Sequence, residues 1–250
     1  MHIIRTFLMA MSMYSAIPVP VSVWRDDCYA MVICGLPAVG AVFGGIWALA
    51  AWACMKYSVP APIFAFLLAA LPLVLTGFFH LDGFLDTCDA VLSRRDRERR
   101  LEILKDSRVG AFAVISFGIL LLGQYAAGLT LAESAFSPRD FILVPAATRM
   151  CASIAVTYGR PLPHSQYTQR EVGRGKTTVL IIEAALILAC SAMLGMGSFV
   201  LTLGAVGFYC LALGYAAHDL GGVSGDLSGF AQTIAECAAM ILGAIVLTNK

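Results

Sequence analysis

The residues best suited to carry chemistry lie in one polar stretch, residues 80–108, within a chain otherwise built from long apolar segments. Its first part holds three carboxylates, Asp82, Asp86 and Asp89, spaced i, i+4 and i+7, so a helix would place them on one face. Neighbouring carboxylates repel each other, and a divalent cation held by their oxygens relieves that repulsion. The alternative is a solvated loop in which Asp82 or Asp89 caps a helix. We expect metal or phosphate chemistry at this cluster, with Mg²⁺ or Mn²⁺ preferred by its all-oxygen ligands.

His80 lies beside these carboxylates and is a candidate general base, because the ordinary pKa of histidine, about 6.5, suits proton transfer at neutral pH. Two residues advance by about 200° around a helix, so His80 on a regular helix would point away from Asp82. The base role therefore requires His80 to precede the helix, where the chain is still extended. The two other roles left open are a hydrogen bond to a metal-bound carboxylate and phosphate binding as an imidazolium ion.

The end of the polar stretch, Lys105, Asp106, Ser107 and Arg108, combines two cations with a carboxylate and a hydroxyl group. Lys105 and Arg108 suit phosphate binding, and Asp106 suits either metal binding or helix capping. Capping is the better interpretation of Asp106 alone, and metal binding gains weight if the motif shares a face of the molecule with Asp82.

Residues 218–226 form a second polar connection, in which Gly221, Gly222 and Gly225 would allow a ligand to approach the backbone closely. Asp226 at its end is a further candidate metal ligand, and a flexible connector is the alternative interpretation of the loop. Arg160 follows an apolar segment and is a candidate phosphate-binding residue. Arg149 lies inside that segment, where a buried arginine is usually either paired or functional. Both roles stay open, with Glu183 and Glu236 as possible ion-pair partners.

Composition places the chain in a membrane. Of its 250 residues 59% are hydrophobic and 13% are charged, whereas soluble domains have about 25% charged residues. The formal net charge of +1 gives no reason to expect a nucleic-acid partner. The eight cysteines include no CxxC pair and are interpreted as small buried apolar residues rather than as disulfides or a zinc site.

The apolar segments predict an all-α fold: a polytopic integral membrane helical bundle with about seven transmembrane helices, forming a single domain over residues 1–250. The 41-residue run 177–217 is too long for one span and must turn at 195–198. The expected spans are 31–52, 57–79, 109–132, 141–159, the two halves of 177–217, and 227–248. Residues 1–27 are expected to form an interfacial or re-entrant segment, and 96–105 an amphipathic helix whose Leu101 and Leu104 face the membrane or the protein.

The positive-inside rule orients these spans in the cell inner membrane. With residues 80–108 in the cytoplasm, thirteen basic residues lie on that side and three, Lys56, Arg139 and Lys250, on the other. This bias predicts that all the polar loops, and hence the active site, face the cytoplasm.

Four ordered segments carry a family resemblance: an N-terminal arginine followed by an apolar run and PVP, then HLDGFLDTCDA, KDSRVGAF and LGGVSGD. They resemble the cobalamin synthase family, the membrane adenosylcobinamide-GDP ribazoletransferases, from about Arg5 to Glu236. The chain departs from the family pattern at Phe78-Phe79, where small residues are common. It also has Ala90-Val91-Leu92-Ser93 in place of a glycine-rich run.

The resemblance implies that α-ribazole or its 5′-phosphate is joined to adenosylcobinamide-GDP, with release of GMP and a requirement for Mg²⁺. The candidate catalytic residues are His80, Asp82, Lys105 and Arg108. The candidate substrate-binding residues are Gly83, Ser107, Arg149, Arg160, Gly221, Gly222 and Gly225. The candidate metal ligands are Asp82, Asp86, Asp89, Asp106 and Asp226. Membrane lipid and the two substrates are the expected partners, with self-association and contacts to other corrinoid-pathway enzymes left open.

Two other functions compete with this one. A CDP-alcohol phosphotransferase uses a similar aspartate-rich membrane site, but its pattern fails here because Asp86-Thr87 stands where that family has Ala-Arg. A transporter or divalent-cation channel would need charges near the bilayer midplane, where this chain offers only Arg149, Glu183 and Glu236.

Overall fold

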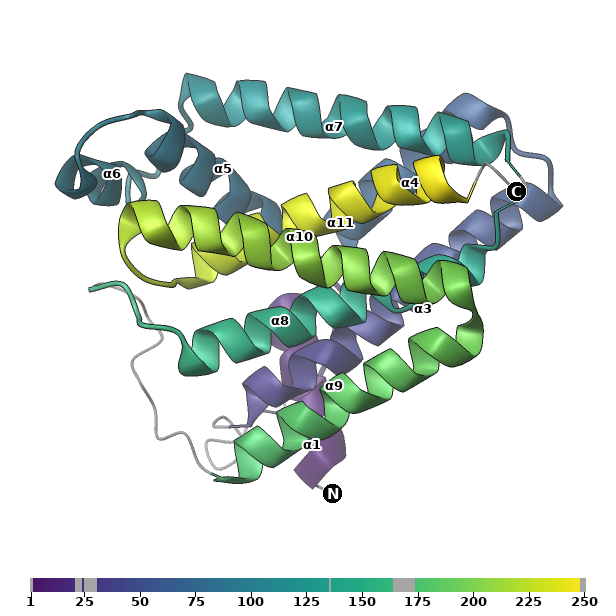
Figure 1. Cartoon of the computed structure of the whole chain (residues 1–250), viewed down its shortest axis with the longest axis horizontal. Helices are drawn as coiled ribbons and strands as arrows, with labels where there is room; N and C mark the ends of the chain where they lie inside the picture. Colours follow the sequence, from purple (N-terminus) through teal and green to yellow (C-terminus); the bar gives the residue numbers. More distant parts are fainter. Residues whose placement is uncertain (1, 21–23, 25–30, 135, 164–173, 248–250) are drawn as a thin grey trace.

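The computed structural model describes residues 2–20, 24, 31–134, 136–163 and 174–247, and all regular elements in these ranges are helices. Figure 1 shows them as one bundle of long helices. In chain order they are α1 (His2–Tyr14), η2 (Val32–Gly35), α3 (Leu36–Lys56), α4 (Ala61–Leu75), α5 (Phe79–Leu92), α6 (Arg97–Ile103), α7 (Ala111–Ala132), η3 (Pro138–Phe141), α8 (Val144–Tyr158), α9 (Arg174–Leu194), α10 (Met196–Leu220) and α11 (Gly225–Val246).

The described residues contain six helices long and apolar enough to cross a membrane, or seven if one bent pair counts as a span. The six are Val32–Lys56, Ala111–Ala132, Pro138–Tyr158, Gly175–Leu194, Met196–Leu220 and Gly225–Val246. The prediction of an all-α bundle with about seven spans is therefore confirmed. The turn in the long apolar run falls at Gly195, whose φ of +126° is a conformation that favours glycine.

The second predicted span differs from expectation. The α4 helix has 15 residues, about 22 Å of helix, which is shorter than the roughly 30 Å hydrocarbon core of a bilayer. Gly77 and Phe78, with φ of +61° and +65°, turn the chain by 92° into α5. As a result Asp82, Asp86 and Asp89 all lie on helix α5, and this helix packs on α7 and α11.

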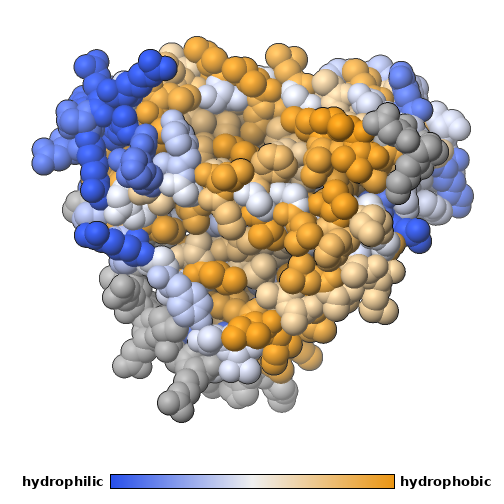
Figure 2. Space-filling view, in the orientation of Figure 1, coloured by the Kyte–Doolittle hydropathy of each residue, from blue (hydrophilic) through white to orange (hydrophobic). Residues whose placement is uncertain are grey.

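The core is organised around α8 and α11, which are the most deeply buried long helices together with α3. Gly40 and Gly44 bring α3 into contact with the backbone of the η3–α8 segment, because a side chain at either position would overlap Pro145 or Ile142. On the outside, apolar side chains such as Ile119 and Leu122 of α7 are exposed, as expected for a lipid-facing surface. Figure 2 shows this broad apolar surface, with a dense hydrophilic cluster over the α5–α6 end.

Two other predicted segments are recovered in part. The amphipathic helix is α6, slightly shorter than predicted, with Leu104 buried and Leu101 packed against the core. The N-terminal segment contains α1, which packs on α3 and buries Met9 and Ala10. Its interfacial or re-entrant placement stays a prediction.

Residues 21–23, 25–30 and 164–173, with Arg25 and Arg170 of the charge count, lie outside the described residues.

Candidate functional site

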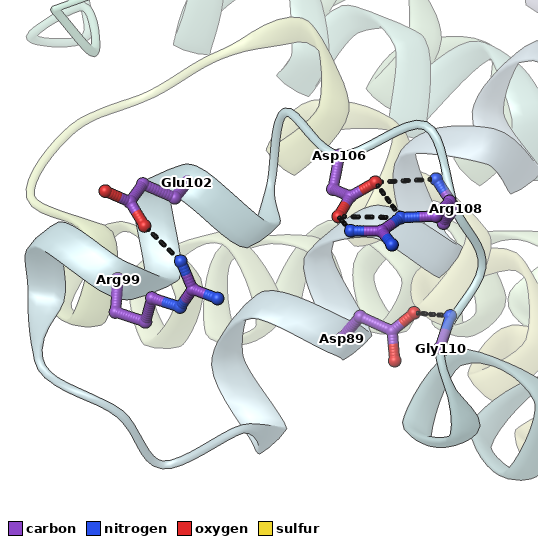
Figure 3. A network of polar contacts seen from close by, with 6 residues as sticks. All are labelled: Asp89, Arg99, Glu102, Asp106, Arg108 and Gly110. Atoms are coloured by element: carbon purple, nitrogen blue, oxygen red, sulfur yellow. Dashed lines mark hydrogen bonds and ion pairs between the residues drawn. The ribbon is translucent and has the colours of Figure 1, made fainter.

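A polar cleft of about 790 Å³ opens between the end of α5, helix α6 and the start of α7. It is lined by Asp89, Ser93, Arg95, Asp96, Arg99, Ile103, Asp106, Arg108, Val109, Gly110, Ala111 and Phe112. Figure 3 shows the α6 wall with Arg99 and Glu102, and the facing side with Asp89, Asp106, Arg108 and Gly110. Three predicted site residues, Asp89, Asp106 and Arg108, are thus brought together at one cleft.

Asp89 binds protein backbone within this cleft. Its carboxylate accepts hydrogen bonds from the N–H groups of Gly110, at 2.6 Å, and Ala113, at 2.9 Å. These N–H groups lie at the start of α7, where no intrahelical acceptor is available. A side chain at position 110 would overlap the Asp89 oxygens. Asp89 therefore caps α7 from a neighbouring helix, but it does so from a buried position within α5 and not from the solvated loop of the alternative interpretation.

Asp106 and Arg108 form an ion pair with each other across the α6–α7 connection. Arg108 donates from Nη2 to Asp106 Oδ2 at 2.7 Å and from Nε to Oδ1 at 3.0 Å (Figure 3). This guanidinium lowers the pKa of the Asp106 carboxyl group from 3.8 to about 2. Asp106 is thus ionised at neutral pH, and its ion pair with Arg108 is exposed to solvent. Lys105 and Ser107 are exposed in the same connection.

A second group of carboxylates lies where the start of α5 meets the start of α11. Asp82 and Asp226 are exposed and Asp86 is half-buried, and Asp82, Asp89 and Asp226 all act electrostatically on Asp86. Gly83 allows this approach, because a side chain there would overlap the Asp226 backbone. Gly83 thus permits the close packing of α5 on α11, and its role in substrate binding stays a prediction.

The chemistry and the arrangement of these carboxylates bear differently on a magnesium site. No described residue donates a hydrogen bond to Asp82 or Asp86, and Asp226 has only a long 3.4 Å contact from Ser224 Oγ. Oxygen donors without cysteine or histidine match the preference of Mg²⁺ and Mn²⁺. Nevertheless, no group of three His, Cys, Asp or Glu side chains within the described ranges is arranged to hold a metal ion. Asp82, Asp86 and Asp226 therefore offer the kind of ligand atom that Mg²⁺ prefers, but their side chains are not arranged as a metal-binding site.

His80 lies within α5 instead of preceding it, so the geometric premise for its role as a base is wrong. The helix begins at Phe79, and the His80 side chain is only 6% exposed. Its ring stands edge-on to Phe79, and it borders a separate small cavity of about 20 Å³ together with Tyr14 and Gln232. The structure thus supports a packing role for His80, away from the cleft.

Arg149 is one of the most deeply buried charged residues in the described part of the chain. Its Nη1 atom donates to Glu236 Oε1 at 2.6 Å and to the Pro145 carbonyl at 3.1 Å, and its guanidinium lies over the Phe43 ring. Of the two proposed partners, the structure selects Glu236 and not Glu183. With 1% of its side chain exposed, Arg149 forms an ion pair between α8 and α11 that supports the structural alternative, and its binding of a ligand stays a prediction.

The glycines of the α10–α11 connection accommodate protein groups. Gly221 has φ of +85°, and a side chain there would overlap the Arg97 guanidinium. Gly222 lies against the Arg160 carbonyl, within a short backbone pairing in which Val223 N–H donates to Arg160 O at 2.7 Å. Both glycines thus pack against protein groups, and the phosphate contacts expected at Gly221 and Gly222 stay a prediction. Gly225 begins α11 and borders the small His80 cavity, and Arg160 is brought beside the loop with its side chain exposed.

The arginines in and just before α6 were not among the predicted site residues. Arg95 and Arg99 line the cleft, whereas Arg97 and Arg100 contact the end of α10. The run RRDRERR, which contains all four, matches none of the motifs described above. Helical spacing was the available signal, because positions 97 and 100 share a face that position 99 does not.

The chain is similar to proteins of one family. The model of the cobalamin-5-phosphate synthase family matches residues 6–244. An adenosylcobinamide-GDP ribazoletransferase from Clostridium perfringens (strain ATCC 13124) is 38% identical over 175 residues, 70% of each chain. Proteins of the same name from Carboxydothermus hydrogenoformans and Clostridium botulinum (strain Eklund 17B) are 35% and 31% identical. These two cover 83% and 74% of this chain, and 76% and 75% of their own lengths.

No solved structure matches the chain. The family match includes the α5 carboxylates, the α6–α7 connection and the α10–α11 loop, and it excludes the phosphotransferase and transporter alternatives. Since that match covers nearly the whole sequence, the chain belongs to the cobalamin-5-phosphate synthase family and is a transferase of cobalamin synthesis.

Proposed function

We propose that the protein is an adenosylcobinamide-GDP ribazoletransferase. In this reaction adenosylcobinamide-GDP and α-ribazole, or α-ribazole 5′-phosphate, give adenosylcobalamin, or its 5′-phosphate, together with GMP. The observation that carries the proposal is the 790 Å³ cleft, large enough for a nucleotide and bordered by Arg95, Arg99 and Arg108. The names of the relatives supply the substrates.

The reaction breaks a phosphoanhydride bond and forms a phosphate ester bond. The 3′-hydroxyl oxygen of the ribazole forms a bond to the phosphorus atom that carries cobinamide, and the bond from that phosphorus to the bridging oxygen breaks. GMP leaves with the bridging oxygen, and the hydroxyl proton passes to solvent. Because charge accumulates on the phosphate oxygens, the cationic side chains of the cleft stabilise the diphosphate and its transition state.

Proton removal needs no dedicated side chain in this scheme. Phosphoryl transfer proceeds through a loose transition state in most analyses, so positioning and charge neutralisation contribute more than a base. Arg99 on the α6 wall and Arg108 on the facing side lie on opposite borders of the cleft. They are suited to hold a diphosphate from both sides.

We further propose that the reaction depends on Mg²⁺, with Mn²⁺ as a substitute. Asp82, Asp86 and Asp226 would hold the ion, which would supply positive charge to neutralise the diphosphate. Their exposed oxygens and all-carboxylate chemistry support this assignment. The active site would face the cytoplasm of a cell inner membrane, as the distribution of basic residues predicts.

The deciding experiment is an assay of membranes containing the protein. Adenosylcobinamide-GDP, Mg²⁺ and either α-ribazole or α-ribazole 5′-phosphate are supplied, and GMP and the corrinoid product are followed by chromatography. We expect equimolar GMP and cobalamin-type product that require both organic substrates. GMP release without the acceptor would indicate hydrolysis instead and would contradict the proposal.

Asp82→Asn and Asp86→Asn test the metal proposal. Each should lower kcat by about 10²-fold or more and raise the Mg²⁺ concentration needed for half-maximal rate, because a cation ligand is lost. Glu98→Gln, which neutralises an exposed carboxylate on α6, is the matched control and should behave as wild type. Near-normal rates for both aspartate variants at saturating substrate would make the cluster structural.

A further inference from the structure

Helix α6 is attached to the C-terminal end of α10 by two arginines. Arg100 Nη1 lies 2.6 Å from Asp219 Oδ2, and both side chains are mostly shielded from solvent, with 18% and 23% exposed. Arg97 Nε donates to the Leu220 carbonyl at 2.8 Å. We call these two contacts the α6 tether. It joins segments more than a hundred residues apart in the chain.

The α10 end is well suited to receive these cations. The last carbonyl groups of a helix have no intrahelical donor, and they carry the negative end of the helix dipole. Gly221 then adopts the left-handed conformation, which leaves room for the Arg97 guanidinium. A Cβ atom at Gly221 would come within 1.2 Å of Arg97 Nη2. The tether therefore depends on the Gly221 backbone as well as on the Asp219 charge.

The other face of α6 borders the cleft. Arg99 and Ile103 are four residues apart and line it, while Arg97 and Arg100 are three apart and face α10. An isolated helix of seven residues is unstable in water, so α6 keeps its place only through contacts with the rest of the protein. The tether and the buried Leu104 supply those contacts.

We propose that Arg97, Arg100 and Asp219 are positioning residues that hold α6 as one wall of the cleft. In this way the α10–α11 connection sets the affinity for the diphosphate-bearing substrate, although these three side chains do not line the cleft. This inference rests on the proposed ribazoletransferase function only for the identity of that substrate.

The kinetic test uses Asp219→Asn, which removes the charge that Arg100 contacts and leaves the amino-acid sequence of α6 unchanged. We expect the KM for adenosylcobinamide-GDP to rise at least about fivefold, with kcat and the KM for the ribazole within about twofold of wild type. The double variant Arg100→Glu/Asp219→Arg restores the pair in reverse and should recover part of the lost affinity. Glu98→Gln, on the same helix, is the matched control.

A second test does not depend on activity. Because Asp219→Asn keeps all arginines of α6, the rate of limited tryptic cleavage between residues 94 and 100 measures directly how firmly α6 is held. We expect faster cleavage there in Asp219→Asn, and wild-type cleavage in Glu98→Gln. If Asp219→Asn does not accumulate, Arg100→Lys keeps both the charge and the tryptic site, and should give an intermediate cleavage rate.

The outcomes separate this inference from the proposed function. A wild-type chain that forms no product sinks the proposed function, while the cleavage measurement still decides whether the tether exists. An active wild type with unchanged KM and cleavage in Asp219→Asn overturns the inference. So does a collapse of kcat with KM and cleavage unchanged, since Asp219 would then act in the reaction itself.

Discussion

His80 illustrates how strongly a residue's role depends on where its helix begins. The side chain is buried in the first turn of α5, beside Phe79 and away from the cleft. We therefore expect His80→Gln to keep kcat within about tenfold of wild type and to keep the acidic limb of the pH–rate profile. Measuring that profile between pH 5 and 9 checks this. Loss of the acidic limb would restore His80 as the base.

Asp106 gives a prediction about pH. Arg108 lowers the pKa of Asp106 from 3.8 to about 2. The stability that their ion pair gives to the folded state is therefore fully present above the ordinary pKa of 3.8, and it is lost as the pH falls through about 2. Asp106 thus stays ionised throughout any practical assay. Asp106→Asn should leave the shape of the pH–rate profile unchanged between pH 5 and 8, with kcat/KM within about tenfold.

The same variant tests the predicted metal role of Asp106. In the structure both carboxylate oxygens are bound to Arg108. If that is their whole role, Asp106→Asn will need no more Mg²⁺ than wild type. A strongly raised Mg²⁺ requirement would instead place Asp106 among the ligands, after a rearrangement of Arg108.

At this scale the sequence predicted which residues lie near one another better than it predicted what they contact. Asp89, Asp106 and Arg108 were predicted as site residues and line one cleft, and their part in the reaction stays a prediction. Their partners were not predictable, because a carboxylate that caps a distant helix has the same sequence signature as a metal ligand. Gly221 is similar: its flexibility was recognised, but the group it admits, Arg97, comes from another helix.

The element scale is best tested at the cap that joins α5 to α7. Asp89→Ala leaves two N–H groups at the start of α7 without their acceptor, which should lower the free energy of unfolding by about 1–2 kcal/mol. Gly110→Ala should destabilise by displacing the same carboxylate, and the two changes together should cost less than their sum. Unfolding in detergent micelles measures each effect.

Gly118→Ala is the control for this series. Gly118 lies in the same helix with no atom near the position of its missing Cβ, so alanine should be neutral or slightly stabilising. Equal losses for Gly110→Ala and Gly118→Ala would show that helix propensity, and not the cap, dominates at position 110.

Helix positions were largely predictable, because membrane-length apolar runs leave the backbone few alternatives to a helix. The bend between α4 and α5 was not predicted. Pro72 lies inside α4, yet the 92° turn occurs at Gly77 and Phe78, and Phe78 adopts a left-handed conformation unusual for a bulky residue. Tertiary packing of α5 on α7 and α11 outweighs that local preference.

Across the whole molecule, the tether requires α6 and the end of α10 to lie on the same side of the membrane. In a variant without native cysteines, Arg95→Cys and His218→Cys should react with a membrane-impermeant thiol reagent from one side, and Lys56→Cys from the other. Removal of the native thiols is necessary because Cys190 and Cys210 are exposed. His218 is preferable to Gly222, where a side chain would overlap Arg160. Labelling of positions 95 and 218 from opposite sides would refute the arrangement.

The contacts that hold the two walls of the cleft differ in sequence separation, and this difference sets an order of assembly during synthesis. Asp89 and Gly110 are 21 residues apart, whereas Arg100 and Asp219 are 119 apart. At about 5–20 residues per second, the ribosome needs roughly 1–4 s between the first two and roughly 6–24 s between the others. A growing chain therefore fixes the α7 side of the cleft early and leaves the α6 wall loose until α10 has been made. A pulse-labelled chain protected at both places simultaneously would contradict this order.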